Sequence, residues 1–319
     1  MLRRALGRPL ASATRLSGGA SQETWAVDAG SGSDALTLIL RRRPGGASSA
    51  SGMAIDLATE ARLLGLAARS GVPVAEVRHV LAPEDGLGSG YLMQRLAGET
   101  IPRKILRDEA LARTRPRLAR QCGEILARIH TVPVASLPPL PVAPAAVQWR
   151  QYRDVYDGFD WPHPVFELAF HWIEERLPSA ADARETLVHG DFRHGNLMID
   201  HTGVCGVLDW EIAHRGDPLE DLGWLCVNSW RFGNIDLPVG GFGVREDLFA
   251  GYEFASGQRV DPERVRLWEV VGSLKWGIMC MMMLSVFERG IDRSVERAAI
   301  GRRASEAEID LLALIGGER

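Results

Sequence analysis

The stretch LVHGDFRHGNLMID, residues 187–200, places a dense group of polar side chains between two short apolar runs. Such apolar runs are typical of buried strands. Polar groups without partners in an apolar surrounding cost a large free energy, so this group needs a metal ion, a phosphate or a hydroxyl compound to satisfy it. We therefore take this stretch as the centre of a candidate site.

The residues that follow predict a β-hairpin. LMID and GVCGVLD are two short apolar strands, and the residues that join them, 200–203, are typical of a turn. A hairpin brings Asn196 and Asp209 to the same open end, and Asp191 lies in the loop that leads into the first strand. Mg²⁺ commonly takes one or two protein carboxylates and completes its shell with water and substrate phosphates. Asn196 and Asp209 are therefore the predicted metal ligands.

Length and composition set the class of protein. A chain of 319 residues is near the size at which single cores divide, which favours two lobes. With 46% hydrophobic residues, 24% charged residues and a net charge of −4, the chain has no general attraction to nucleic acid or to an anionic membrane. Four scattered cysteines without a CxxC pair favour reduced thiols in a cytoplasm. The apolar stretch 276–287 is shorter than the roughly 20 residues that cross a bilayer, so we expect a buried helix there.

The first 96 residues predict an antiparallel sheet with one helix. Strand patterns cover residues 13–30, on both sides of a Ser-Gly-Gly turn, and residues 35–44. Residues 53–70 have apolar side chains at helical spacing, with Gly71 after them as a cap. Two further strands are expected within residues 77–96. This part forms the first predicted lobe.

Residues 97–319 predict a second, mainly helical lobe. One helical face ends at His130, and a proline-rich connector is expected over residues 131–147. Two amphipathic helices around 148–158 and 164–177 precede the polar stretch, and residues 293–315 predict one last helix. The predicted fold class is α+β with two lobes.

The polar stretch also has the spacing of a known template. Asp191 and Asn196 are separated by four residues, as in the HxDxxxxN catalytic loop of kinases, and Asp209 falls where the metal-binding aspartate stands. HGDFRHGN and the later VLDWEIAHRGDPLEDLGWL together resemble the aminoglycoside phosphotransferase family, in particular the branch similar to the kinase-like domains of acyl-CoA dehydrogenase fusion proteins. LSGGASQETW and RSVERAAIGRR are similar to that branch too, so the resemblance covers nearly the whole chain.

The resemblance implies a two-lobe protein-kinase-like fold that uses ATP and Mg²⁺ to phosphorylate a hydroxyl group of a small molecule. Asp191 would accept the substrate proton, and Asn196 and Asp209 would hold the metal. A glycine turn would cover the ATP phosphates. An ion pair would link a strand to the helix within the first lobe, and the hinge between the two lobes would contact adenine. These cofactor-binding residues are Gly18, Gly19, Ala20, Ser21, Gln22, Arg41, Glu60, Gln94 and Leu96.

Several roles stay open at the level of sequence. Arg42 is an alternative to Arg41, because a shift of one residue in the strand exchanges them. The SGGAS turn departs from GxGxxG and is equally typical of an ordinary hairpin. Arg193 and Glu211 flank the site and could contact substrate or form an internal ion pair. The further candidates for substrate contact are Trp149, Tyr152 and Trp230.

The acceptor is predicted only as a class. A hydroxylated acyl thioester or acid ranks above an aminoglycoside, by family analogy alone. Two alternatives use the same residues: a nucleotide-binding module without catalysis, and a metal-dependent phosphate-ester hydrolase. His189 is expected to order the loop, and Asp217 and Asp221 to cap or anchor it.

Overall fold

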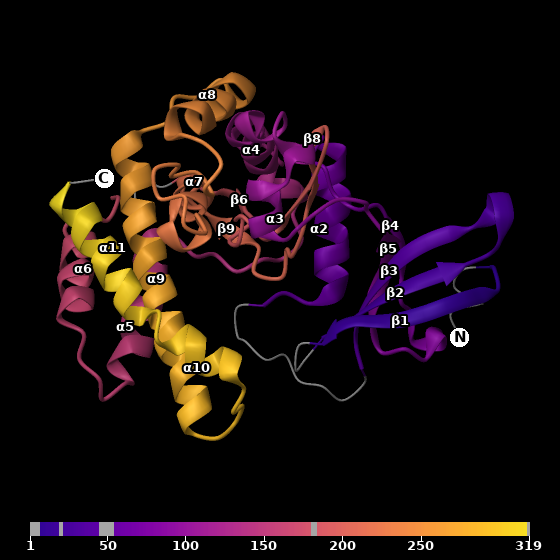
Figure 1. The fold of residues 1–319 in the computed structure, drawn as a ribbon, viewed down its shortest axis with the longest axis horizontal. Helices are drawn as coiled ribbons and strands as arrows, with labels where there is room; N and C mark the ends of the chain where they lie inside the picture. Colours follow the sequence, from indigo (N-terminus) through magenta and orange to yellow (C-terminus); the bar gives the residue numbers. More distant parts are fainter. Residues whose placement is uncertain (1–6, 19–21, 45–53, 180–183, 318–319) are drawn as a thin grey trace.

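The computed structural model describes residues 7–18, 22–44, 54–179 and 184–317. The sheet forms a smaller part at the N-terminal side, and the helices form a larger part that contains the C-terminus (Figure 1). The chain passes from sheet to helices over residues 95–101. We propose residue 96 as the boundary between two lobes.

The sheet has five strands: β1 (Leu10–Gly18), β2 (Glu23–Ala29), β3 (Leu36–Arg43), β4 (Val77–Val80) and β5 (Ser89–Gln94). Their order is β1-β2-β3-β5-β4, and every neighbouring pair is antiparallel. Alternate residues of a strand face opposite sides. One side forms a small apolar core around Val27, Leu38, Leu40 and Leu92. In the register of the sheet, Arg41 lies opposite Thr24 on β2 and Tyr91 on β5.

Helix α2 (Leu57–Arg69) packs against β4 and β5. The carboxylate of Asp56 accepts a hydrogen bond from the backbone N–H of Thr59, which caps the first turn. Gly71 follows the helix with a φ of +77°, a conformation that favours glycine, as its expected role as a cap requires. The helix and all the strands of the sheet are therefore confirmed for the described residues.

The second part holds α3 (Pro102–Arg107), α4 (Arg115–His130), α5 (Ala145–Asp157), α6 (Pro164–Glu174), α7 (Leu219–Cys226), α8 (Arg245–Ser256), α9 (Pro262–Glu288), α10 (Val295–Gly301) and α11 (Ala304–Gly316). The predicted apolar face of α4 is buried in the main core. Helices α4 and α8 approach closely at Gly123 and Gly251. A Cβ on Gly123 would lie 2.0 Å from the carbonyl oxygen of Leu248, so only glycine permits this packing.

Helix α9 runs through the middle of this part (Figure 1). By length and composition alone it could span a membrane, with a mean hydropathy of 1.7 over its most apolar window. More than half of that window, 56%, is buried, and α9 packs against α5, α6, α7, α10 and α11. Length and composition do not distinguish a membrane span from a core helix, whereas this burial is typical of a core helix.

Two short antiparallel pairs frame the polar stretch. Strand β6 (Thr186–Val188) pairs with β9 (His214–Gly216), and β7 (Leu197–Asp200) forms a hairpin with β8 (Gly203–Val207). The hairpin is the one that the sequence predicts. Its two outer ends leave Asn196 and residues 208–211 at the same side of the molecule.

Two predicted elements differ from the structure. Residues 293–315 form two helices, α10 and α11, because the chain turns at residues 302–303. Gly301 lies so close to Leu284 of α9 that a Cβ would come within 2.6 Å of it, and the turn then lets α11 pack along α9. The extended connector is also shorter than expected, since α5 already begins at Ala145.

Candidate active site

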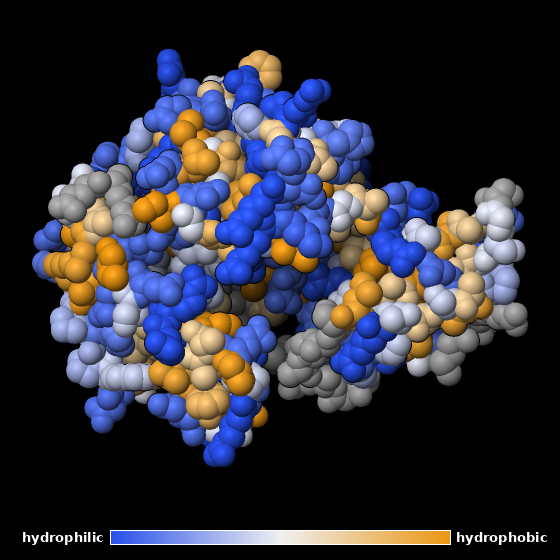
Figure 2. All heavy atoms as spheres, in the orientation of Figure 1, coloured by the Kyte–Doolittle hydropathy of each residue, from blue (hydrophilic) through white to orange (hydrophobic). Residues whose placement is uncertain are grey.

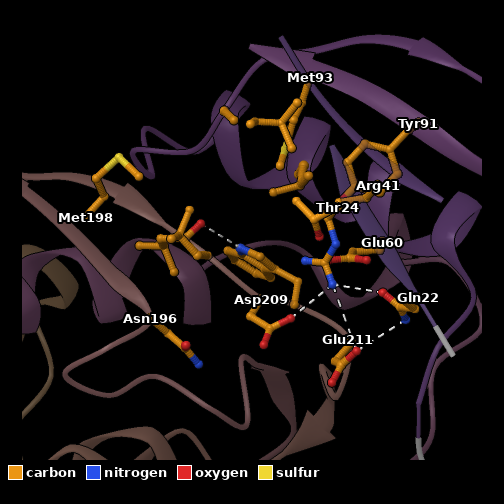
Figure 3. Close-up of a pocket in the computed structure, with 16 residues that line it drawn as sticks. Gln22, Thr24, Arg41, Glu60, Tyr91, Met93, Asn196, Met198, Asp209 and Glu211 are labelled. Atoms are coloured by element: carbon orange, nitrogen blue, oxygen red, sulfur yellow. Dashed lines mark hydrogen bonds and ion pairs between the residues drawn. The ribbon is translucent and has the colours of Figure 1, made fainter. Parts of the chain in front are cut away.

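A cavity of about 500 Å³ lies between the sheet and the second part of the chain, where the surface is hollowed in Figure 2. Its walls come from β2, β3, β5 and α2 on one side and from β7 and the segment after β8 on the other. Apolar side chains, Ile39, Leu64, Ala75, Met93, Met198, Val207 and Leu208, form a large share of the lining. Polar side chains from both parts gather at another side of the cavity (Figure 3).

Arg41 on β3 links the two parts at the cavity. Its Nη1 lies 2.9 Å from Oε1 of Glu60 on α2, and its Nη2 donates hydrogen bonds of 3.1 Å to Asp209 and to Gln22 (Figure 3). Arg42 lies on the other face of the strand and pairs with Glu23 at 2.8 Å. The structure therefore brings Arg41, and not Arg42, to Glu60.

Burial dominates the electrostatics of this ion pair. Only 1% of Glu60 is exposed, and burial raises its pKa to about 7, although the charge of Arg41 acts in the opposite direction. Burial would lower the pKa of Arg41, but the carboxylates of Glu60 and Asp209 raise it above its ordinary range. Arg41 thus stays charged, and Glu60 changes its charge near neutral pH.

Asp191 is held by three N–H donors. Its Oδ1 accepts hydrogen bonds of 2.9 Å from Nε of Arg193 and from the indole N–H of Trp224. Its Oδ2 accepts a 2.6 Å bond from the amide nitrogen of Asn196. Because that nitrogen is turned toward Asp191, the amide oxygen of Asn196 is the atom that can bind a cation.

The loop that carries Asp191 is anchored from α7. The buried carboxylate of Asp221 accepts the backbone N–H groups of His189 at 2.8 Å and Gly190 at 2.9 Å, and the Nε2 of His130 at 3.1 Å. Burial would raise the pKa of Asp221, but the hydrogen bond and charge of His130 hold it below its ordinary value. Asp221 therefore fixes the backbone of the loop, which is the anchoring role expected from the sequence.

His189 joins the loop to the segment after β8. Its Nε2 donates to the carbonyl oxygen of Leu208 at 3.0 Å, and its Nδ1 accepts the N–H of Asp191 at 3.2 Å. Burial lowers the pKa of His189, so the ring is neutral, as this donor and acceptor arrangement requires. One imidazole thus sets the position of Asp191 relative to Asp209.

Asp209 and Asn196 are suitable ligands for a Mg²⁺ ion that a nucleotide would also bind. Both line the same cavity, and Asp209 has a φ of +63°, which is rare for a residue other than glycine. Within the described ranges, no group of three or more His, Cys, Asp or Glu side chains could hold a metal. One carboxylate and one amide oxygen are a small set of ligands, which suits an ion whose other ligands are phosphates and water.

The predicted phosphate and adenine contacts are only partly brought together. Gln22 lines the cavity, and Gly18 is the last residue of β1, whereas Gly19, Ala20 and Ser21 lie outside the described residues. At the predicted hinge, the backbone N–H of Gln94 donates to the carbonyl oxygen of Glu76 at 2.8 Å, and the contact of the Gln94 backbone with adenine stays a prediction. Leu96 packs close to Gly206 on β8.

The predicted substrate contacts lie at the cavity, beside Asp191, and away from both. Glu211 lines the cavity and accepts a 3.3 Å hydrogen bond from Gln22. Arg193 contacts Asp191, and the ring of Trp230 lies 4.6 Å from its guanidinium carbon. Trp149 does not line this cavity: its indole N–H donates to the carbonyl oxygen of Phe170 and its ring packs against α6, so its contact with substrate stays a prediction.

Sequence reasoning missed Lys275, which lies on α9. Its ammonium group donates to the carbonyl oxygen of Gly190 at 3.3 Å and lies 4.4 Å from the ring centre of Trp224. Burial would lower the pKa of Lys275, but Tyr152 and nearby carboxylates raise it, so the buried side chain is charged. Tyr152, a predicted substrate contact, forms a side-chain hydrogen bond with Lys275. A single lysine inside a long apolar helix was the available signal.

Comparison with known proteins places this geometry in a family. The family model described as "Phosphotransferase enzyme family" matches residues 12–268. Acyl-CoA dehydrogenase family member 10 of Mus musculus is 31% identical over 204 residues, which are 60% of this chain and 18% of the relative. The chain thus matches less than a fifth of that relative's length.

Solved structures share the fold over nearly the whole chain. A Ralstonia eutropha protein named for the aminoglycoside phosphotransferases has a TM-score of 0.76 at 20% identity, and the match covers 97% of this chain and 93% of that one. A thermostable mutant of the aminoglycoside phosphotransferase APH(4)-Ia, in complex with ADP and hygromycin B, has a TM-score of 0.62 at 16% identity, with 98% and 96% covered. With its sheet, its helical part and its HGDFRHGN loop, the chain belongs to the phosphotransferase enzyme family and has its kinase-like fold.

Proposed function

We propose that the protein transfers the γ-phosphate of ATP to a hydroxyl group of a small molecule in a Mg²⁺-dependent reaction. One observation carries the proposal: Asp191 contacts Asn196, and Asn196 and Asp209 line one cavity together with the Arg41–Glu60 pair. The ADP complex of the related fold supports a nucleotide in this cavity.

The residues divide the reaction between them. Asp191 accepts the proton of the acceptor hydroxyl, whose oxygen forms a bond to the γ-phosphorus as the bond to the β–γ bridging oxygen breaks and ADP leaves. Arg41 contributes a fixed positive charge beside the phosphates, and Asn196 and Asp209 would hold Mg²⁺. When bound, Mg²⁺ neutralises the charge of the phosphate oxygens. Positioning and charge neutralisation account for most of the catalysis of phosphoryl transfer.

The acceptor that we propose is a hydroxylated acyl thioester or acid. The similarity to a protein named for acyl-CoA dehydrogenases supports an acyl compound. The side chains beside Asp191 support an acceptor without multiple positive charges, because Arg193 and Lys275 are both cationic and lie over tryptophan rings. An aminoglycoside, which carries several ammonium groups, would be repelled there.

A reducing cytoplasm is the proposed setting. All four cysteines, Cys122, Cys205, Cys226 and Cys280, are free thiols, and three of them are buried. Burial raises the pKa of Cys122 and Cys226, so these thiols are inert core residues.

The test is a screen for ADP formation with hydroxy acids, hydroxyacyl thioesters and aminoglycosides, in which the parent is compared with Asp191→Asn. We expect acceptor-dependent ADP and a phosphorylated product with the parent, and turnover on the order of 100-fold slower with Asp191→Asn at unchanged Mg-ATP affinity. Unchanged turnover would remove Asp191 as the base.

Two other outcomes of the same screen favour other functions. Binding of Mg-ATP without turnover of any acceptor would identify a nucleotide-binding module. Release of phosphate from esters in the absence of ATP would identify a hydrolase.

A further inference from the structure

Arg193 bridges the proposed base and an aromatic wall. Its Nε donates to Oδ1 of Asp191 at 2.9 Å, and its guanidinium carbon lies 4.6 Å from the ring centre of Trp230. A quarter of the Arg193 side chain is exposed. Among the described residues, Nε of Arg193 donates to Asp191 and Nη1 donates to the carbonyl oxygen of His194. The guanidinium therefore retains further N–H donors for a ligand.

The wall consists of Trp224, Trp230 and Trp276. Their rings meet edge to face, with centres 5.1 Å and 4.9 Å apart. Besides Arg193, two more cations lie over it: Lys275 at 4.4 Å from Trp224 and Arg303 at 5.3 Å from Trp276. The indole nitrogen of Trp230 is buried and has no hydrogen-bond partner among the described residues. The wall thus consists of apolar rings with a cationic side chain over each of them.

The two oxygens of Asp191 face different surroundings. Oδ2 contacts Asn196, which lines the nucleotide cavity, whereas Oδ1 contacts Arg193 and Trp224, and none of the three wall tryptophans lines that cavity. Trp224 and Trp230 are buried, whereas Arg193 is partly exposed, so an acceptor that approaches past Arg193 meets Oδ1. That oxygen already accepts two N–H donors, one of them charged, which leaves it poorly placed to take a hydroxyl proton.

We propose that Arg193 senses the acceptor: it holds Oδ1 of Asp191 until an anionic group close to the acceptor's hydroxyl draws the guanidinium away. This inference rests on the proposed function and adds a specificity-determining residue to it. The exchange makes and breaks only hydrogen bonds, because Arg193 stays charged and the only proton transferred is the one that Asp191 takes from the hydroxyl. Trp224 continues to position the carboxylate through its N–H.

A consequence is selectivity for an anion rather than for a carbon skeleton. A neutral acceptor of the same shape leaves the Arg193–Asp191 pair intact and competes with it for Oδ1. The same pair suppresses hydrolysis of ATP by water when no acceptor is present. Both effects depend on the Arg193–Asp191 pair, whereas Asp191 is needed for every acceptor.

The experiment compares short hydroxy acids with their primary amides as acceptors, for the parent, Arg193→Gln and Arg193→Lys. The parent is expected to prefer the acid in kcat/KM, and Arg193→Gln to lose this preference by about 10- to 100-fold. In Arg193→Gln, kcat/KM for the acid falls, whereas kcat/KM for the amide stays the same or rises. Hydrolysis of ATP without an acceptor rises, and KM for Mg-ATP is unchanged. Arg193→Lys, which retains the charge, keeps part of the preference.

Arg176→Gln is the matched control. Arg176 also lies over a tryptophan, 4.3 Å from the ring of Trp172, and contacts a carboxylate, Glu175 at 3.1 Å, but it follows α6 and its ion pair, ring contact and hydrogen bonds are with residues 172 and 175. It should leave the preference for the acid unchanged. Thermal unfolding of each variant shows whether it is folded.

Equal losses with acids and amides in Arg193→Gln would overturn the inference, because Arg193 would then only position Asp191. An unchanged preference would overturn it too. A parent that turns over neither series would instead remove the proposed function, and the inference with it.

Discussion

Glu60 carries a local conflict between burial and charge. The sequence places it on the apolar stripe of a helix, where a carboxylate is unusual, and the structure leaves only 1% of it exposed. The guanidinium of Arg41 compensates part of the cost, yet the pKa of Glu60 remains raised, to about 7. A buried acid that titrates near neutral pH makes the stability of the folded chain depend on pH.

We expect the parent to lose stability relative to Glu60→Gln as the pH rises. The ordinary pKa of 4.5 applies to the unfolded chain and about 7 to the folded chain, so the folded chain binds this proton more tightly. The stabilisation is complete below pH 4.5 and is lost as the pH rises through 7. Urea unfolding at pH 4 and pH 8 should show the difference between the two proteins change by up to about 3 kcal/mol. Parallel curves would contradict the raised pKa.

At the scale of elements, the alternation of β3 decides which arginine belongs to the site. Arg41 and Arg42 are adjacent in sequence but point to opposite faces, the first toward Glu60 and Asp209 and the second toward Glu23. Two separate nitrogens of Arg41 serve its partners, which a lysine ammonium at one point cannot do.

Arg41→Lys should therefore lower the free energy of unfolding by about 1–3 kcal/mol, because one buried partner loses its cation. Mg-ATP affinity should fall as well. Arg42→Lys is the control on the same strand: its partly exposed pair with Glu23 lies outside the cavity lining, so it should change stability by less than about 1 kcal/mol and leave Mg-ATP affinity unchanged. Denaturant unfolding and isothermal titration with Mg-ATP measure both. Equal effects of the two substitutions would show that the face of β3 does not matter.

Helix α9 supplies a second example, because its one buried lysine supports the loop of Asp191. We expect Lys275→Met to lower kcat about 10-fold, since the carbonyl of Gly190 loses its donor and the loop is less well positioned. Stability should fall by about 1–3 kcal/mol, because the buried carbonyl of Gly190 is left without its donor.

Steady-state kinetics measures the change in kcat, and thermal unfolding measures the change in stability. Lys104→Met is the control, since Lys104 is an exposed lysine on α3 that pairs with Glu99 at 3.1 Å. A loss of stability with an unchanged kcat would show that Lys275 supports the fold and not the position of the loop.

At the scale of the whole molecule, the cavity is closed by both parts of the chain. Gln22 and Arg41 come from the sheet, whereas Asp209 and Glu211 come from the helical part, and their contacts join the two (Figure 3). A nucleotide bound between them should stabilise the two parts together.

AMP-PNP with Mg²⁺, at 100 times its dissociation constant, should raise the free energy of unfolding by about 2.7 kcal/mol in a single transition. The shift should disappear in Asp209→Ala or when EDTA removes the metal, because Asp209 is the proposed carboxylate ligand. Differential scanning calorimetry measures it. An equal shift with EDTA would show that the nucleotide binds without the metal.

Local patterns predicted most of the elements. Short apolar runs between turn residues predicted the sheet strands and the β7–β8 hairpin, and helical spacing predicted α2 and α4, because these signals depend on neighbours in the chain. The break between α10 and α11 and the packing of Trp149 against α6 both arise from contacts between helices, which no local pattern contains. Lys275 was missed for the same reason, since its partner Gly190 is 85 positions away.

The sequence by itself determined the chemical groups of the site and their family, because the spacing of Asp191, Asn196 and Asp209 is fixed by one loop and one hairpin. Only the tertiary structure decided which arginine meets Glu60, and that Trp224 and Arg193 share one oxygen of Asp191. The physical reason is how far apart in the sequence the interacting residues lie. Hairpins and helices follow from neighbouring residues, whereas burial, ion pairs and the pKa shifts they cause depend on segments that only packing of the whole chain brings together.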